Sequence, residues 1–192
     1  MSRSARVLAP SDVRRLVARV RSGSFAQRNT VLVLLSFRAG LRACEMAGVT
    51  WEMMTRPDGK LSDIIEIADH IAKNGRARRI PLHPQLRAAM IELRRNEGQR
   101  SGPVIRSQRG GHMTPRAVVN WFSAIYQTLG FDGCSSHSGR RTFITQSARL
   151  VSKAGGSLRD VQELAGHRAL TTTERYIEGD REAQRRLVRL MC

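Results

Sequence analysis

The chain has 192 residues, of which 33 are Lys or Arg and 16 are Asp or Glu, so its formal net charge is +17. This length can bury a real hydrophobic core, and a content of 41% hydrophobic residues argues against a disordered chain. The longest apolar run, residues 31–35, is too short to cross a bilayer, and no secretory signal is visible. Three widely spaced cysteines fit neither a disulfide framework nor a thiolate metal site, and they indicate a reducing cytoplasm.

The positive charge is carried almost entirely by arginine, because only Lys60, Lys73 and Lys153 are lysines. A guanidinium group stays charged and presents a planar fork of donors that matches phosphate. A solvated Arg-rich surface would have the same composition. An excess of this size in a folded chain nevertheless makes nucleic acid the leading candidate partner.

The first fifty residues predict three helices. Ser11 is a candidate N-cap for the first, whose apolar residues recur at helical spacing as far as Val20. The second covers about 27–38 around the apolar run, and Gly40 ends it. A short third helix is expected over about 42–47.

The centre of the chain predicts a β-hairpin, with strands over 61–68 and 78–82 and a turn at Lys73-Asn74-Gly75. Isoleucines at 64, 65 and 67 favour the first strand. Basic residues around the hairpin tip are candidate DNA contacts: Arg76, Arg78 and Arg79.

The rest of the chain predicts helices over about 84–96, 115–129, 142–150, 157–165, 171–177 and 180–191. Thr114 and Pro115 form an N-cap and first-turn pair, and Tyr126 belongs to the apolar stripe that follows. Thr171 and Glu174 have the spacing of a capping box. The predicted fold class is therefore α+β, mainly α, with one small antiparallel hairpin or sheet in a single domain over residues 1–192.

Two pairs of residues stand three apart and would share a helix face. Arg42 and Glu45 follow Gly-Leu, and His137 and Arg140 flank Ser-Gly. Taken alone, the first pair is an ordinary ion pair and the second is a weak pattern that is more often structural than catalytic.

A histidine and a tyrosine complete the set of candidate residues. His167 follows a glycine that ends a predicted helix, and Tyr176 comes nine residues later. Tyr176 lies between Arg175 and Ile177 in a polar stretch, so packing explains it less well than it explains Tyr126.

The order of these motifs, with Lys73 on the hairpin between them, resembles the catalytic domain of the tyrosine recombinase, or phage integrase, family over about residues 11–176. The resemblance implies the DNA breaking-rejoining fold and a 3′-phosphotyrosyl intermediate. It also implies the following roles: Tyr176 as nucleophile, Arg42 and Arg140 on the phosphate oxygens, Lys73 as general acid, His137 as acceptor of the tyrosine proton, His167 as a hydrogen-bond partner of the phosphate, and Glu45 holding Arg42. Arg141 is a further expected DNA contact.

The resemblance also implies partners and a location. Double-stranded DNA would be the substrate of a homo-oligomer, tetrameric in synapsis, with a possible accessory protein and no metal or other cofactor. The expected location is the bacterial cytoplasm at the nucleoid, without membrane contact. The apolar C-terminal segment from residue 187 would pack either onto a neighbouring protomer or onto its own core.

The sequence departs from the family pattern at three places. About forty residues precede Arg42, so we expect no N-terminal core-binding domain in this chain, as in the short fimbrial phase-variation invertases. Gly139 stands where leucine or a similar apolar residue is common, which is expected to loosen the start of that helix. Residues 154–157 look like a short insertion.

Three functions are compatible with these motifs. A site-specific recombinase for integration, excision or inversion accounts for all of them. A DNA-binding accessory protein derived from a recombinase would bind DNA without cleaving it, although all six catalytic positions are filled. A type IB topoisomerase shares the chemistry, but it typically has Ser-Lys shortly before its tyrosine, where this chain has Thr173-Glu174-Arg175.

Overall fold

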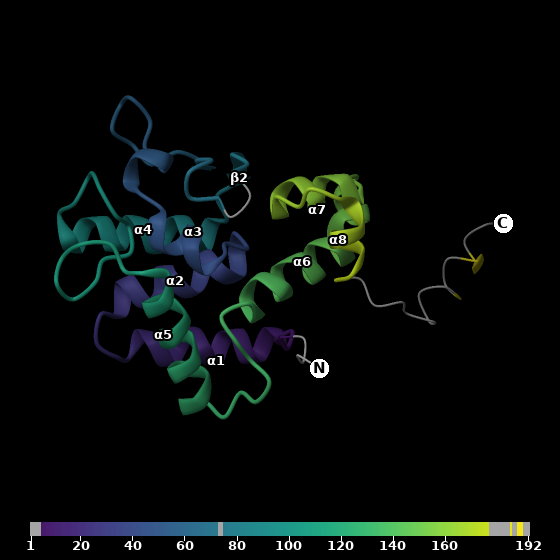
Figure 1. The fold of residues 1–192 in the computed structure, drawn as a ribbon, viewed down its shortest axis with the longest axis horizontal. Coiled ribbons are helices and arrows are strands. Elements are labelled where there is room, and N and C mark those ends of the chain that lie inside the picture. Colours follow the sequence, from purple (N-terminus) through teal and green to yellow (C-terminus); the bar gives the residue numbers. More distant parts are fainter. Residues whose placement is uncertain (1–4, 73–74, 177–184, 186–187, 190–192) are drawn as a thin grey trace.

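The computed structural model describes residues 5–72, 75–176, 185, 188 and 189 (Figure 1). Within them it is mainly helical with one two-stranded antiparallel sheet, so the predicted fold class is confirmed. In chain order the elements are α1 (Pro10–Arg21), α2 (Ala26–Arg38), α3 (Ala43–Gly48), a 3-10 turn (Trp51–Met54), β1 (Ile64–Ile67), β2 (Arg78–Pro81), α4 (Pro84–Glu97), α5 (Pro115–Thr128), α6 (Ser138–Leu150), a second 3-10 turn (Val151–Ala154), α7 (Leu158–Ala165) and α8 (Leu170–Glu174). In the described part of the chain, no helix is long and apolar enough to span a membrane.

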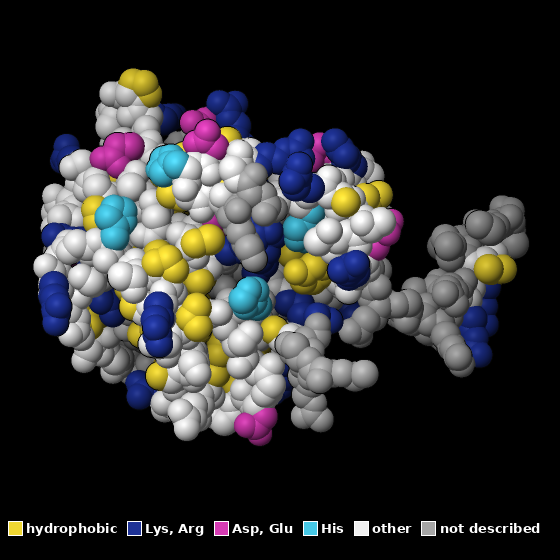
Figure 2. Space-filling view, in the orientation of Figure 1, with side chains coloured by type: hydrophobic (Ala, Val, Ile, Leu, Met, Phe, Trp, Pro, Cys, Tyr) yellow, Lys and Arg dark blue, Asp and Glu magenta, His cyan; other side chains and the backbone are white. Residues whose placement is uncertain are grey.

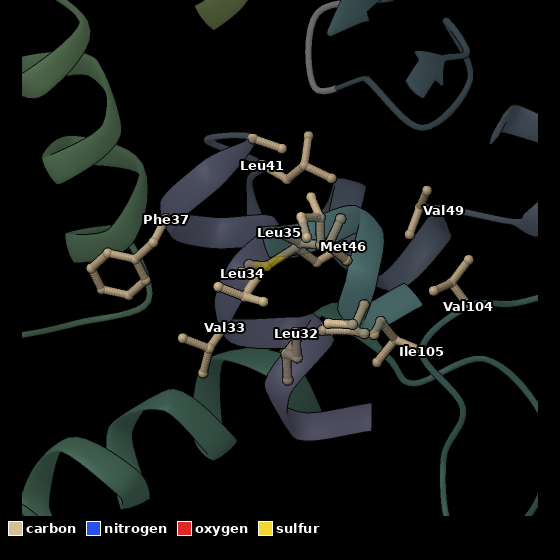
Figure 3. Packing of buried hydrophobic residues seen from close by; sticks show 14 of the residues in the cluster. Leu32, Val33, Leu34, Leu35, Phe37, Leu41, Met46, Val49, Val104 and Ile105 are labelled. Carbon is tan, nitrogen blue, oxygen red and sulfur yellow. The ribbon is translucent and has the colours of Figure 1, made fainter. Parts of the chain in front are cut away.

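Helix α2 forms the centre of the main hydrophobic core. Every residue from 28 to 37 is buried, because α1, α4 and α6 contact it on different sides. Figure 3 shows Leu32, Leu34 and Leu35 among side chains from distant segments, including Met46 and Ile105, and Phe37 directed towards α6. A helix that is apolar around most of its circumference needs such burial.

The sheet has the predicted hairpin topology but shorter strands. Ile65 pairs with Ile80 and Ile67 pairs with Arg78 in antiparallel register. Ile65, Ile67 and Ile80 are buried. Glu66 and Arg79 form a 2.8 Å ion pair on the other face, which is exposed to solvent. The turn residues 73 and 74 lie outside the described residues.

Several predicted helix boundaries were wrong. Helix α1 begins at Pro10 after Ala9, because proline suits the first helical position and displaces Ser11 from the cap. Helix α8 begins at Leu170, so Thr171 lies inside the helix and cannot cap it. Ser157 does cap α7, in a capping box with Asp160. The helix predicted over 180–191 falls largely outside the described residues.

Helix α6 starts at Ser138, four residues earlier than predicted, and Gly139 lies buried in its first turn. A Cβ atom on Gly139 would lie 2.8 Å from Ser36 Cβ and 3.0 Å from Phe37 Cδ2. Gly139 therefore marks a close contact between α6 and α2. The sequence had suggested that Gly139 loosens the start of the helix. Instead, Gly139 lies within its regular first turn.

A second, smaller core joins α6 to α7. Ile144, Val161 and Ala165 are buried together, and Tyr176 packs at their edge. In Figure 1, α7 and α8 lie side by side at the far end of α6. Helix α6 thus carries the chain from the main core to the segment that ends in Tyr176.

Candidate active site

Arg42 and Glu45 are joined at the start of α3. Arg42 is the N-cap residue, and its backbone N–H donates to Glu45 Oε2 over 2.8 Å. Its guanidinium Nη1 donates to Glu45 Oε1 over 3.2 Å. The Glu45 side chain is fully buried, so this carboxylate is part of the interior and not of a surface ion pair.

Arg78 reaches the same carboxylate from β2. Its Nη1 and Nη2 donate to the two oxygens of Glu45 over 2.8 and 2.9 Å, and its Nε donates to the Leu164 carbonyl over 3.1 Å. Only 7% of its side chain is exposed. The Arg78 guanidinium therefore binds within the interior, while the residue also lines a groove beside the site, so the expected DNA contact of Arg78 stays a prediction.

The charge of Glu45 is maintained by these partners. Burial alone would raise the pKa of Glu45, but the hydrogen bonds and charges of Arg78 and Arg42 outweigh burial and hold this pKa below its ordinary value. The carboxyl group is therefore ionised at neutral pH.

Arg140 is the most enclosed of the three arginines, with 3% of the residue exposed. Its Nη1 donates to the Gly40 carbonyl over 2.7 Å, and its Nη2 donates to the Ala165 carbonyl over 2.6 Å and to His167 Nε2 over 3.0 Å. Burial, followed by the like charge of Arg42, lowers the pKa of Arg140 to about 10. Arg140 is still a cation at neutral pH.

The tautomer of His167 follows from its neighbours. Arginine has no acceptor, so Nε2 must accept from Arg140, and the ring proton lies on Nδ1, 3.0 Å from Thr173 Oγ1. Burial, with the charges of Arg140 and Arg42, lowers the pKa of His167 to about 4. His167 is therefore neutral, and in this arrangement both ring nitrogens are engaged within the protein.

Tyr176 is half-buried against this group. Its ring stacks on His167 with centroids 5.6 Å apart, and the Arg141 guanidinium carbon lies 5.8 Å from the tyrosine ring centroid. Thr145 donates to the Tyr176 carbonyl over 3.2 Å. Two positions of α6, one turn apart, thus contact the ring and the backbone of Tyr176.

The structure brings together five of the seven predicted catalytic and supporting residues, from the start of α3, from α6, from just after α7 and from just after α8: Arg42, Glu45, Arg140, His167 and Tyr176. Figure 2 shows Lys or Arg and His side chains close together near the middle of the face in view. His137 is the N-cap of α6, one turn before Arg140, and it is exposed. Lys73 lies outside the described residues.

Three of the expected DNA contacts line a groove beside the site. The groove has a volume of about 360 Å³ and contains Arg76, Arg78, Arg79 and His167 in its wall. Arg76 and Arg79 are exposed, and Arg79 pairs with Glu66. Arg141 lines a second pocket of about 310 Å³ together with Tyr176.

Sequence reasoning missed the inward orientation of Arg78 and the contact of Thr173 with His167. The first had a usable signal. Side chains alternate along a strand, so Arg78 lies on the same face as the buried Ile80, and Arg79 lies on the solvent-exposed face. The second had none, because it depends on how α8 packs beside α7.

A model of the phage integrase family matches residues 6–182. The chain belongs to this family. Two curated members of the family are similar to it. The tyrosine recombinase XerC of Brucella suis biovar 1 (strain 1330) is 28% identical over 182 residues, which cover 88% of this chain and 53% of the relative. XerC of Mesorhizobium japonicum (strain LMG 29417 / CECT 9101 / MAFF 303099) is 29% identical over 155 residues, covering 79% and 46%. The chain spans about half the length of these relatives.

Solved structures of an integrase and of a recombinase share the fold. The Tn1549 transposon integrase in complex with transposon right end DNA matches with a TM-score of 0.76 and 17% identity, over 97% of this chain and 66% of that one. XerA recombinase matches with a TM-score of 0.72 and 19% identity, over 95% and 63%. The resemblance to the phage integrase family and the predicted fold are thereby confirmed.

Proposed function

We propose that this chain is the catalytic domain of a site-specific DNA recombinase, which cleaves and rejoins double-stranded DNA through a 3′-phosphotyrosyl intermediate. The observation that carries the proposal is the half-buried Tyr176 stacked on His167, which is itself bonded to the buried cation Arg140. This geometry suits chemistry at a phosphate group. Membership of the phage integrase family supports DNA recombination as the reaction.

The charge of the site suits a phosphodiester in its transition state. Three guanidinium groups (Arg42, Arg78 and Arg140) surround one carboxylate (Glu45), so the cluster is cationic before DNA binds. A phosphodiester carries one negative charge, and its pentacoordinate transition state carries about two. Fixed cations in a buried site stabilise that added charge without reorganisation, and the loss of one such donor typically costs on the order of 10²–10³ in rate.

The proposed reaction conserves the phosphodiester bond energy. The Tyr176 oxygen attacks phosphorus and forms the new P–O bond, while the bond to the 5′-oxygen breaks. The phenolic proton passes to His137, and the departing 5′-oxygen takes a proton from Lys73. Both assignments rest on the family resemblance. Attack of a 5′-hydroxyl on the phosphotyrosine reverses the step and rejoins the strand.

His167 has a defined function in the DNA-free arrangement, where it accepts from Arg140 and holds this cation between two carbonyl groups. To donate a hydrogen bond to phosphate, as the family pattern suggests, Nε2 would have to give up its hydrogen bond from Arg140 and carry a proton itself. Arg140 would then be free to turn one of its own N–H groups to the same phosphate.

Contacts with DNA outside the cluster are assigned to Arg76, Arg79 and Arg141, which lie beside it. Similar structures support a DNA partner, since XerH recombinase was solved bound to its difH substrate. We further propose that the chain acts on chromosomal DNA in the cytoplasm as a homo-oligomer, tetrameric in synapsis, with a possible accessory protein.

The test is covalent trapping on nicked half-sites taken from DNA that flanks the gene of this protein. Wild type and Tyr126→Phe should form a denaturant-resistant adduct, and Tyr176→Phe should bind DNA equally well but form none. Tyr126 is a matched control, because it is the other tyrosine of the chain and lies in the main core. Tight binding without an adduct in wild type would favour the non-cleaving accessory protein.

A further inference from the structure

Arg78 contacts three parts of the site at once. It binds both oxygens of Glu45 at the start of α3, and its Nε bonds to the Leu164 carbonyl in the last turn of α7. It also passes close beside the residue that precedes His167: a Cβ on Gly166 would lie 3.0 Å from Arg78 Cδ. Since Arg78 belongs to β2, a single side chain ties the hairpin to α3 and to the end of α7.

The hydrogen bonds around Glu45 are unevenly shared. Arg78 makes two side-chain bonds to this carboxylate, at 2.8 and 2.9 Å, in a fork-to-fork geometry. The Arg42 guanidinium makes one, at 3.2 Å, and its backbone N–H makes another. Arg78 is therefore the principal counter-charge of Glu45, so Glu45 neutralises the charge of Arg42 only in part.

We propose that Arg78 is a positioning residue of the active site, which neutralises Glu45 so that the Arg42 guanidinium is held in place yet remains available to the scissile phosphate. This inference rests on the proposed function, because it assigns Arg42 to the phosphate. Without Arg78, Arg42 would be the only arginine hydrogen-bonded to the buried carboxylate among the described residues, and the phosphate would lose that donor.

The alternative is that Arg78 merely joins β2 to α7 and stabilises the fold. The two readings differ in how Glu45 behaves when Arg78 is removed. If Arg78 matters through the charge of Glu45, then neutralising Glu45 as well should restore much of the loss. If Arg78 matters only as a link between elements, the second change should restore nothing.

The variants are Arg78→Met, the double variant Arg78→Met/Glu45→Gln, and Arg78→Lys. The last keeps a cation beside Glu45 and serves if the Met variant does not fold, because removing one partner of a buried pair is strongly destabilising. Arg56→Met is the matched control, since Arg56 pairs with Asp58 over 2.9 Å but about half of each side chain is exposed. That exposed pair contributes little.

Single-turnover adduct formation on the nicked half-site measures the catalytic effect. We expect Arg78→Met to lower the rate by about 10²-fold, as for the loss of one fixed donor. The double variant should recover to within about tenfold of wild type, and Arg56→Met should match wild type. Equal rates in wild type and Arg78→Met, or equal losses in the single and double variants, would overturn the proposal.

The pH profile supplies a readout that a purely structural role would not change. The charged groups facing Glu45 are Arg42 at the start of α3, Arg78 on β2 and Arg140 on α6, with neutral His167 beyond them. Without Arg78, burial raises the pKa of Glu45, so lowering the pH protonates it and releases Arg42. The rate of Arg78→Met relative to wild type should rise from pH 8 to pH 5, while that of the double variant should stay flat. A flat ratio for the single variant would contradict the proposal.

Urea unfolding of the same variants over this pH range needs no DNA and separates the two possible failures. If wild type forms no adduct, the proposed function fails and the catalytic role of Arg78 fails with it. The unfolding midpoint of Arg78→Met, relative to wild type, should still recover as the pH falls. If wild type does form the adduct and Arg78→Met shows no such recovery, only the role of Arg78 is refuted.

Discussion

The close contact of α6 with α2 gives a quantitative prediction for Gly139→Ala. In an unhindered helix this change would stabilise the protein by up to about 1 kcal/mol, because alanine loses less backbone freedom on folding. Here the new methyl group would lie 2.8 Å from Ser36 Cβ and 3.0 Å from Phe37 Cδ2, whereas carbon atoms prefer roughly 3.5–4.0 Å. The two helices would have to separate by close to 1 Å in order to accept it.

Overpacking of this kind typically costs about 1–3 kcal/mol, so after the helix-propensity gain we expect a net loss of about 1 kcal/mol, with the opposite sign to that gain. For a chain of this size, this loss corresponds to a fall in melting temperature of roughly 2–4 °C. Adduct formation should fall as well, because Arg140 is the next residue and depends on the carbonyl groups of Gly40 and Ala165.

A double-mutant cycle with Ser36→Gly tests the cause. Ser36→Gly alone is expected to cost about 1 kcal/mol as a glycine inside a helix, but in its presence Gly139→Ala should cost less than half as much as in wild type. Gly111→Ala is the control, because a Cβ there meets nothing within 4 Å. A Gly139→Ala protein that melts at or above the wild-type temperature would refute the close contact, as would additive effects in the cycle.

Three further predictions concern stability and are checked by urea or thermal unfolding. The pKa of His167, lowered to about 4 by burial and by Arg140, lies below the value of about 6.5 in the unfolded chain, so the unfolded state takes up a proton that the folded state does not. His167 therefore costs stability as the pH falls from about 6.5 towards 4, and His167→Gln should lose less stability between pH 7 and pH 5, by on the order of 1–2 kcal/mol. An equal loss in both proteins would contradict this. Tyr126→Phe should be neutral or stabilising by up to about 1 kcal/mol, because the buried Tyr126 hydroxyl has no hydrogen-bond partner among the described residues, and a marked loss would show that it has one. Ser157→Ala should cost about 1 kcal/mol through loss of the α7 capping box with Asp160, and an unchanged midpoint would mean that the cap contributes nothing.

Elements whose pattern is set by local chemistry could be predicted from the sequence. The apolar run of α2, the proline starts of α4 and α5 and the burial of Tyr126 all follow from periodicity and capping. The candidate site residues could be picked by motif order, because the residues that handle a phosphate are few in kind. These predictions needed no knowledge of how distant segments pack.

The remainder depends on contacts between segments far apart in the chain. The local sequence around Gly139 suggests a weak helix start. Its role in the close contact between α6 and α2 depends on Ser36, which lies about a hundred residues earlier in the chain. The charge of Arg78 suggested a DNA contact and did not suggest its ion pair with Glu45, although strand alternation with Ile80 indicated that the side chain turns inward. The tautomer of His167 is fixed by Arg140 and Thr173 together, which no local pattern contains.

The arrangement of charges is unfavourable to the DNA-free fold and favourable to the proposed chemistry. Three arginines share one buried carboxylate, and the repulsion between them contributes to the lowered pKa values of Arg140 and His167. A core built only for stability would replace such a group by apolar side chains, which is often neutral or stabilising. In the proposed reaction, a bound phosphate would supply the missing negative charge, and its transition state would supply more. Substrate binding would then relieve part of the repulsion that the folded protein tolerates, and the attack of Tyr176 would relieve more, which is the direction that lowers the reaction barrier.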